Sequence, residues 1–376
     1  MTAPGSSSAT RFAALFITQF AAVGVMMPFI PPLMTAAGLS AGQVGGVLAA
    51  GAAVRLVAGP LGGWLADALG RPRAVMAGGA MLAALAACLY GLAQDLAGLL
   101  AANLLMAVGF AAVVPLGDAQ ALRAAREEGW DYGRVRALGS VAFIVAAGAA
   151  GWLAGQAGAS SIAWLLAGCL GLAAAAALAV PASGLAGRRG GLAFGAVMAL
   201  PGFRRILAAA ALIQGSHAAY YAFGSIHWEK AGVPAGTIGL LWAWSVVAEV
   251  ALFAWGRGLV ERLGPRGLAL VAAAGGLLRW GIMAETVAWP ALVLAQALHA
   301  LTFGAMHLAT MRVMQASVPP AVAGTAQTML AAGIGGAMMA GTLVSGRVYA
   351  AFGAEVFWAM AGMCVVAMIA ARRLPG

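Results

Sequence analysis

The sequence predicts an all-α membrane protein whose twelve transmembrane helices form two pseudo-symmetric six-helix bundles. Of its 376 residues, 63% are hydrophobic and only 9% are charged, against about 25% charged in a typical soluble domain. This composition excludes the soluble and the disordered classes of protein. The apolar runs lack the strict alternation of a membrane barrel and are separated by Gly, Pro and Arg, which favours helices.

Each apolar run is long enough for one membrane crossing, which takes about 20 residues in a helix. The expected first six helices span 12–37, 42–66, 74–93, 96–121, 134–156 and 160–181. The second six span 206–231, 236–260, 267–286, 289–314, 320–349 and 352–371. The chain therefore divides into a tail (1–10), an N-terminal bundle (11–182), a linker (183–204) and a C-terminal bundle (205–376).

The arginines predict the orientation in the membrane. The net charge is +10, and no basic module for nucleic acid accompanies it, so the cations mark topology. With twelve crossings, one side of the membrane carries Lys230 and Arg347, and the other carries fifteen arginines. These are Arg11, Arg71, Arg73, Arg123, Arg126, Arg134, Arg188, Arg189, Arg204, Arg205, Arg262, Arg266, Arg312, Arg372 and Arg373. Because cytoplasmic loops are rich in Arg and Lys, both termini and the linker are expected in the cytoplasm of a plasma (inner) membrane protein.

An internal repeat relates the two halves. The loop after the second expected helix reads GWLADALGRPR (63–73), and the loop after the eighth reads RGLVERLGPRG (257–267). Asp67 and Glu261 lie 194 residues apart, and each precedes a glycine (Gly70, Gly264) by three positions. A parallel repeat of six helices is typical of secondary transporters, which bind their solute between the halves near the bilayer midplane.

These motifs resemble the major facilitator superfamily over essentially the whole chain. The residues of the first loop that resemble the superfamily signature are Gly63, Asp67, Gly70, Arg71 and Arg73. DYGRVRALGS (131–140) resembles the lactose-permease-like branch, which includes phenylpropionate permeases and nucleoside:proton symporters. Three further segments resemble the phenylpropionate permease group most: SHAAYYAF (216–223), WSVVAEV (244–250) and LHALTFGAMH (298–307). The resemblance implies alternating access, proton symport and a gating role for Asp67, Gly70, Arg71 and Glu261.

Ionisable residues inside apolar helices are costly, so each one is a candidate functional residue. Asp118 and Arg136 lie 18 residues apart on either side of the same cytoplasmic turn, which places them at similar depth. The lactose permease has an acid and an arginine with this spacing that engage substrate, and the resemblance implies the same role here. A buried pair that serves structure alone is the alternative interpretation.

A second set of ionisable residues lies in the C-terminal half. The spacing of Glu249, Arg279 and His299 resembles that of the proton-coupling residues of the lactose permease. Two positions differ, because Thr302 replaces the proton-carrying acid and Gln296 replaces a lysine. We therefore expect Glu249 to carry the proton, with Asp118 as the second candidate. The alternative is that Glu249 and Arg279 only neutralise each other.

Polar residues on two helices are candidates for lining the solute site. Gln214, His217 and Tyr221 share one face at i, i+3 and i+7, an arrangement that suits a solute bearing a ring. Gln19 is a polar group within the first helix. Helix packing with satisfied hydrogen bonds explains such a face equally well.

The predicted function is secondary active transport. Arg55, Arg136 and Arg279 outnumber Asp118 and Glu249 by one charge, which favours an anionic solute such as an aromatic carboxylate. The alternatives on the same fold are a proton-coupled exporter of drugs or metabolites and a sugar or nucleoside symporter. Catalytic, nucleotide-binding and metal-binding motifs are missing from the sequence, so we expect no enzyme activity, no metal and no cofactor besides the proton gradient. The expected partners are the solute, protons and the lipid bilayer, and we expect a functional monomer.

Overall fold

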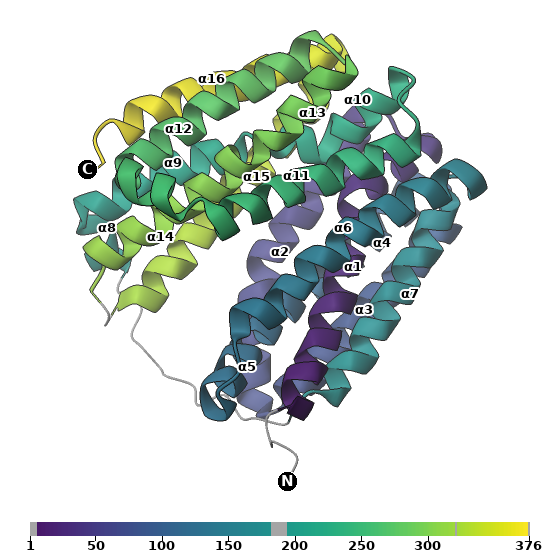
Figure 1. The fold of residues 1–376 in the computed structure, drawn as a ribbon. Coiled ribbons are helices and arrows are strands. Elements are labelled where there is room, and N and C mark those ends of the chain that lie inside the picture. Colours follow the sequence, from purple (N-terminus) through teal and green to yellow (C-terminus); the bar gives the residue numbers. More distant parts are fainter. Residues whose placement is uncertain (1–5, 182–193, 320–321, 375–376) are drawn as a thin grey trace. The chain divides into compact units, whose positions relative to one another are not determined.

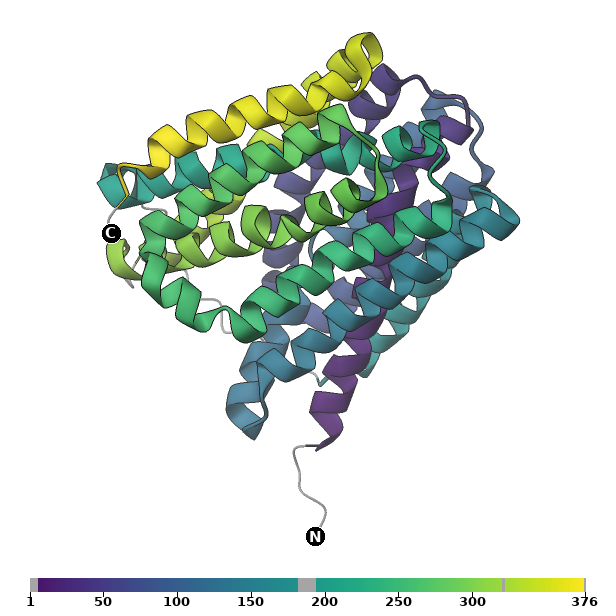
Figure 2. The same ribbon diagram turned by 45° about the horizontal axis from the view of Figure 1, so that its top comes forward.

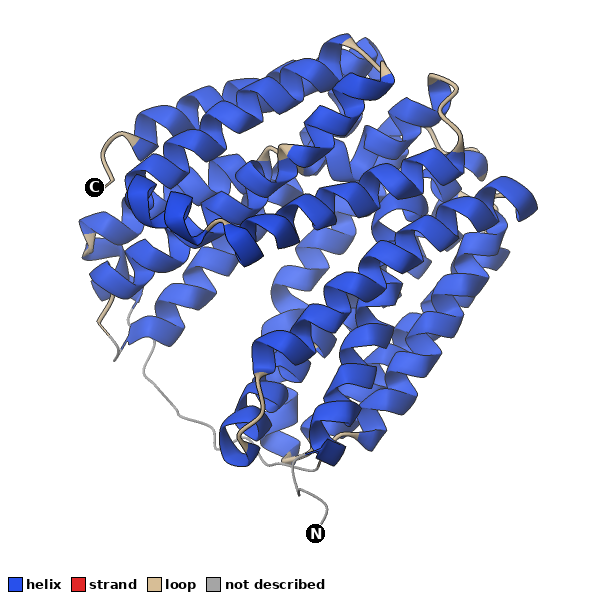
Figure 3. Cartoon of the chain, viewed as in Figure 1, coloured by secondary structure: helices blue, strands red, loops and turns tan. Residues whose placement is uncertain are grey.

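The computed structural model describes residues 6–181, 194–319 and 322–374. Within these ranges the chain is made of helices and short connecting loops, without strands (Figure 3). The described helices group into two compact units. The all-α class predicted from the sequence is confirmed.

The first unit takes its described residues from 1–39, 50–187 and 233–243. Its helices are α1 (Ser6–Ala36), most of α2 (Ala41–Leu69), α3 (Pro72–Leu92), α4 (Leu96–Phe110), α5 (Val113–Glu128), α6 (Tyr132–Ala157) and α7 (Ser160–Ala179). Helix α1 packs against α6 and α7, and the three run side by side (Figure 1). Phe12, Leu15 and Phe16 of α1 are fully buried in this unit, where they anchor its apolar core.

The second unit takes its described residues from 40–49, 188–232 and 244–376. Its first elements are α8 (Phe194–Ala199), α9 (Pro201–Gly215), the π-helix η1 (Tyr220–Gly224), α10 (Ser225–Lys230) and the end of α11 (Ala235–Trp255). They are followed by α12 (Arg257–Glu285), α13 (Trp289–Ala297), the π-helix η2 (Ala300–Ala305), α14 (Met306–Ser317), α15 (Ala323–Phe352), η4 (Gly353–Glu355) and α16 (Val356–Ala371). Helix α16, in yellow, runs beside α12, in green (Figure 2). Apolar side chains of α9, α12, α14 and α16 fill the core of the unit.

The helices account for the twelve expected crossings. Ten described stretches are long and apolar enough to cross a membrane. One of them, Ala323–Ala371, has 49 residues and contains both α15 and α16, so it holds two crossings. The seventh crossing is not among the ten; in it a turn and the π-helix η1 lie between the shorter helices α9 and α10.

Part of the predicted linker (183–204) is helical. Residues 182–193 of that region lie outside the described residues, but α8 and the start of α9 fall within it. Residues 1–5 of the predicted tail are likewise not described, and α1 begins at Ser6.

The repeated loop motif has the same backbone feature in each unit. Gly70 has φ of 61° and Gly264 has φ of 60°, with ψ of −179° at Gly264. This left-handed half of backbone space is open to glycine and strained for residues with a Cβ atom. Gly70 follows the end of α2, and Gly264 kinks α12 just before Pro265. The glycines of the repeat therefore make the sharp turn that each loop needs.

Two crossings of the second unit contain π-helical segments. In η1 and η2 the backbone takes an extra residue per turn, a feature that is frequent at functional sites. Just before η1, the side chains of Ser216 and His217 hydrogen-bond to backbone carbonyls of Ile213 and Gln214. In the six-plus-six architecture expected from the sequence, the helices of each half are themselves related in threes, and the seventh and tenth crossings are then expected in equivalent positions.

Candidate functional site

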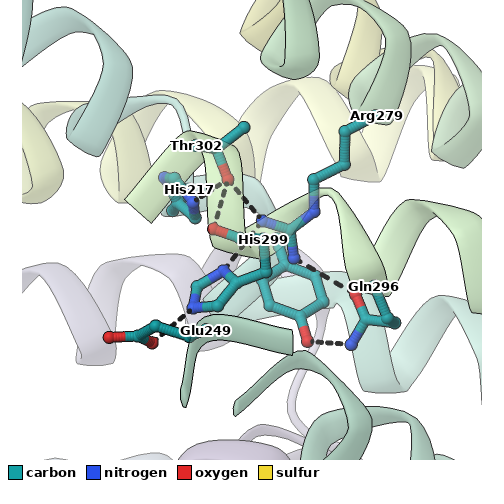
Figure 4. Close-up of polar contacts among 7 residues, drawn as sticks. His217, Glu249, Arg279, Gln296, His299 and Thr302 are labelled. Atoms are coloured by element: carbon teal, nitrogen blue, oxygen red, sulfur yellow. Dashed lines mark hydrogen bonds and ion pairs between the residues drawn. The ribbon is translucent and has the colours of Figure 1, made fainter. Parts of the chain in front are cut away.

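The main cluster of polar residues lies in the second unit. It is formed by side chains from the seventh crossing, α11, α12 and the tenth crossing (Figure 4). Its members are joined by hydrogen bonds and one close contact between a carboxylate and an imidazole: His217, Tyr220, Glu249, Arg279, Gln296, His299 and Thr302. The sequence predicted four of these seven as site residues.

Arg279 is the centre of this cluster. Its side chain is fully buried. Nη1 donates to His299 Nδ1 and to Thr302 Oγ1, both at 3.0 Å, and Nη2 donates to Gln296 Oε1 at 3.1 Å. The three acceptors are an imidazole, a hydroxyl and an amide, so the hydrogen bonds leave the guanidinium charge uncompensated by a carboxylate. Burying such a charge costs several kcal/mol unless other contacts offset it.

Aromatic rings provide part of the compensation. The guanidinium carbon of Arg279 lies 4.7 Å from the ring centre of Tyr220 and 4.6 Å from that of Trp280. These distances fall within the range of cation–π attraction, which strengthens when water is excluded. The Tyr220 hydroxyl also accepts a hydrogen bond of 2.6 Å from Gln296 Nε2. Tyr220 and Gln296 thus hold the guanidinium in one orientation.

His299 connects Arg279 with Glu249. Because the guanidinium can only donate, His299 Nδ1 must accept, and the proton of the neutral ring is on Nε2. Nε2 lies 3.7 Å from Glu249 Oε2. The side chains of His299 and Glu249 are 8% and 17% exposed, so this carboxylate is the more accessible of the two. A carboxylate in this position can exchange a proton beside a fixed imidazole.

His217 carries its ring proton on the other nitrogen than His299 does. Nδ1 lies 3.0 Å from the Ile213 carbonyl and 3.2 Å from the Gln214 carbonyl, and therefore carries the proton. Nε2 lies 3.1 Å from Thr302 Oγ1. The ring is fully buried and meets the His299 ring edge to face, with centres 5.5 Å apart.

The other predicted residues of the seventh crossing lie beside this cluster. The rings of Tyr221 and His217 are 5.6 Å apart, and Tyr221 is partly exposed. Gln214 is buried, and its backbone carbonyl is an acceptor of the His217 ring. Their role in lining a solute site stays a prediction.

A second polar cluster lies in the first unit. Arg136 Nε donates to Asp118 Oδ1 at 3.1 Å, and the Tyr132 hydroxyl donates to the same oxygen at 2.9 Å. The two charged side chains are 28% and 30% exposed. The Arg136 guanidinium lies 3.8 Å from the centre of the Phe20 ring and 5.5 Å from that of Phe16. The spacing of 18 residues thus brings the acid and the arginine together, as expected.

Gln19 lies near this pair. The side chain is fully buried on α1, and both of its terminal amide atoms are without a hydrogen-bond partner. A Cβ atom at Gly117, which precedes Asp118, would stand 3.5 Å from Gln19 Oε1. A buried amide without hydrogen-bond partners is costly, which keeps Gln19 a candidate polar group beside Asp118.

The predicted gating residues lie in the two repeated sequence motifs, Asp67 in the last turn of α2 and Glu261 in α12. Asp67, Gly70 and Arg71 are exposed at the turn between α2 and α3. Glu261 is exposed on the first turns of α12, where its Oε1 lies 2.8 Å from Arg257 Nε. Their role in gating is not tested by these positions.

Three residues of the main cluster were not predicted as site residues: Tyr220, Gln296 and Thr302. Gln296 and Thr302 each lie three positions from His299, and Tyr220 lies three positions after His217. This helical spacing beside a predicted histidine was the available signal. Among the described residues, no group of three or more His, Cys, Asp or Glu side chains could hold a metal ion.

The helical spans and the polar clusters that they carry are those of a multi-pass membrane protein of the transporter class. Residues 9–360 match the model of the MFS_1 like family. The chain belongs to this family and so to the major facilitator superfamily, whose members are transporters rather than enzymes.

Named relatives and solved structures agree with this assignment. The chain is 34% identical to the "Probable 3-phenylpropionic acid transporter" of Escherichia coli (strain K12) over 370 residues, 96% of each chain. It is 30% identical to the "Maltose permease" of Geobacillus stearothermophilus over 276 residues, which cover 72% of this chain and 70% of the permease. The crystal structure of the nucleoside transporter NupG superposes with a TM-score of 0.81 at 16% identity, covering 96% of this chain and 98% of NupG. The fold predicted from the sequence is thereby confirmed.

Proposed function

We propose that this protein imports a small aromatic carboxylate together with protons by alternating access. The observation that carries the proposal is Arg279, a fully buried arginine whose hydrogen-bond acceptors are all neutral. An intramembrane charge is tolerated where function needs it. A guanidinium with spare charge beside aromatic rings is a suitable environment for a carboxylate attached to a ring.

The proton gradient is the proposed energy source, and no other cofactor is needed. Glu249 is the proposed proton carrier, because its carboxylate is partly exposed and lies close to His299. Carboxyl groups within membrane helices are typical members of proton relays in transporters. Asp118 is the second candidate for this role.

Asp118 and Arg136 are proposed to bind the solute in the first unit, with Gln19 beside them. The partly exposed ring of Phe20 packs on the Arg136 guanidinium, so an aromatic acid would find a cation and a ring in one place. The substrate class is supported by the relative that is named as a 3-phenylpropionic acid transporter. The relatives named for maltose and for nucleosides support a sugar or a nucleoside as the second candidate.

Uptake into proteoliposomes tests the proposal. With an inwardly directed proton gradient, we expect accumulation of labelled 3-phenylpropionate that a protonophore abolishes and that cinnamate inhibits. Outward transport under the same gradient would instead favour the exporter. Accumulation of maltose or uridine without competition from aromatic acids would contradict the carboxylate assignment.

The proposed setting is the plasma (inner) membrane, with both termini in the cytoplasm and a monomer as the working unit. The excess of arginines in the loops of one side supports this orientation. Solute, protons and lipid are the proposed partners, and nucleic acid is not among them.

A further inference from the structure

We propose that His217 is a second proton-binding group of this site. Thr302 is the positioning residue, because its hydroxyl can hydrogen-bond to His217 both when the ring is neutral and when it is protonated. The inference rests on the proposed proton coupling. It arises from the hydrogen-bond directions around the Thr302 hydroxyl group, which lies within hydrogen-bond distance of both His217 and Arg279 (Figure 4).

Three groups surround Thr302 Oγ1. Arg279 Nη1 lies at 3.0 Å, His217 Nε2 at 3.1 Å and the His299 carbonyl at 3.4 Å. Arginine can only donate and a carbonyl can only accept. The hydroxyl therefore accepts from Arg279 in every state, and its own proton can point either to His217 or to the His299 carbonyl.

When His217 is neutral, the direction of the Thr302 hydroxyl proton is determined. Nδ1 carries the ring proton because two backbone carbonyls, those of Ile213 and Gln214, face it. Nε2 then has a free lone pair, and the Thr302 hydroxyl donates to it. Every donor and acceptor on this path is satisfied.

The hydrogen-bonding groups are also satisfied when His217 is protonated. When His217 takes up a second proton on Nε2, this nitrogen donates to Thr302 Oγ1, and the hydroxyl turns its proton to the His299 carbonyl. The hydroxyl oxygen then uses both of its lone pairs, for Arg279 and for His217. No heavy atom has to move, so the site is built for both states.

The neighbouring charges determine when the second proton binds. A protonated His217 stands across Thr302 from the Arg279 guanidinium, and two such cations repel in a low-dielectric site. Their repulsion falls when an anion is near, either the Glu249 carboxylate beyond His299 or the carboxylate of an aromatic acid. The titratable and charged groups that face or adjoin His217 are Arg279, His299, Tyr220, Tyr221, Glu249 and Cys364. Because the cations among them oppose the second proton, we expect it to bind together with the anionic solute.

Nuclear magnetic resonance of the protein with ¹⁵N-labelled histidine, in lipid nanodiscs, tests the inference without transport. His217→Asn assigns the signals of His217 among the four histidines of the chain. We expect neutral His217 to carry its proton on Nδ1 and neutral His299 on Nε2, and added 3-phenylpropionate to raise the pH at which His217 becomes doubly protonated. A proton on Nε2 of neutral His217, or no effect of the added acid on its titration, would overturn the proposal.

Variants of Thr302 test its positioning role. Thr302→Val removes the acceptor for protonated His217, and a hydrogen bond to a charged group is stronger than one to a neutral group. The midpoint of His217 protonation, and of the pH profile of uptake, should therefore move to lower pH by about one unit, which is about tenfold in proton affinity. Thr302→Ser keeps the hydroxyl and should restore the original midpoint.

Thr310→Val is the matched control. Thr310 is also buried in the tenth crossing, but its hydroxyl donates to the Met306 carbonyl and takes no part in the network. Equal shifts in Thr302→Val and Thr310→Val, or no shift in either, would contradict the role of Thr302. If the wild type shows no proton-driven uptake, the proposed function fails, while the histidine signals still decide this inference.

Discussion

At the scale of single residues, the site depends on which atoms can donate a proton and which can only accept one. Arg279 sets these directions, because a guanidinium donates at every nitrogen and remains charged at all accessible pH values. His299 must then direct an N–H toward Glu249, and Thr302 must accept from Arg279. The orientation of the network thus follows from one buried arginine.

We expect Glu249→Gln to uncouple solute movement from protons. The amide keeps the size of the side chain but cannot release a proton near neutral pH, so proton-driven accumulation should fall more than about tenfold, as for a functional intramembrane acid. Exchange of solute across the membrane without a gradient should persist. Both rates can be measured in the same proteoliposomes.

Glu355→Gln is the control for this change, because Glu355 is exposed in η4 and belongs to neither cluster. It should leave both rates near those of the wild type. If Glu249→Gln keeps full proton-driven accumulation, Glu249 is not the proton carrier, and Asp118→Asn becomes the variant to measure for proton coupling.

At the scale of elements, the site is shaped by interruptions in otherwise apolar helices. The π-helices η1 and η2 follow His217 and His299 closely and belong to crossings that are expected in equivalent positions of the repeat. Hydropathy predicted these crossings from their length alone, since an apolar run has the same composition whether its backbone hydrogen bonds follow the α or the π pattern. It therefore could not place Tyr220, Gln296 and Thr302 around Arg279.

The residues that sequence reasoning did place are those with strong signals. Asp118 and Arg136 flank one turn, so their spacing alone brings them to one depth, and the ion pair is present at 3.1 Å. Arg279, His299 and Glu249 were singled out because ionisable residues in apolar helices are costly, and they were grouped because their spacing resembles that of the lactose permease's proton-coupling residues. Gln296 and Thr302 are uncharged, and such residues in a membrane helix are more often ordinary packing groups.

The glycine of the second loop motif provides a test at this scale. Gly264→Ala should destabilise the protein by about 1–3 kcal/mol, because φ of 60° with ψ of −179° belongs to a region that is essentially restricted to glycine. The measurement is thermal unfolding of the purified protein in detergent.

Gly258→Ala is the matched control on the same helix. Gly258 has no positive φ, and a Cβ atom there meets nothing within 4 Å. Alanine at such a position should be neutral or stabilising, by about 0.5–1 kcal/mol. Equal stability of the two variants would show that the turn at Gly264 is not strained by a side chain.

At the scale of the whole molecule, the number and direction of crossings depend on how the loops are charged. The composition alone requires a membrane, because 9% charged residues cannot cover a soluble fold of 376 residues. The arginine distribution then predicts the side on which each loop lies, and a miscount by one helix would mix the two sets of loops.

Single cysteines in two loops test the crossing number and the orientation together. In a chain with Cys88, Cys169 and Cys364 replaced by alanine, Arg126→Cys should be protected from a membrane-impermeant maleimide added to intact cells, whereas Glu355→Cys should react. Both positions are exposed in the structure, so a lack of labelling reports the side of the membrane and not burial. Seven crossings separate the two positions in the twelve-helix topology, and an odd number places them on opposite sides.

Labelling at Arg126→Cys alone would show that the orientation is the reverse of the predicted one. Labelling of both, or of neither until the cells are permeabilised, would mean an even number of crossings, and the seventh crossing, which η1 interrupts, would be the first to re-examine.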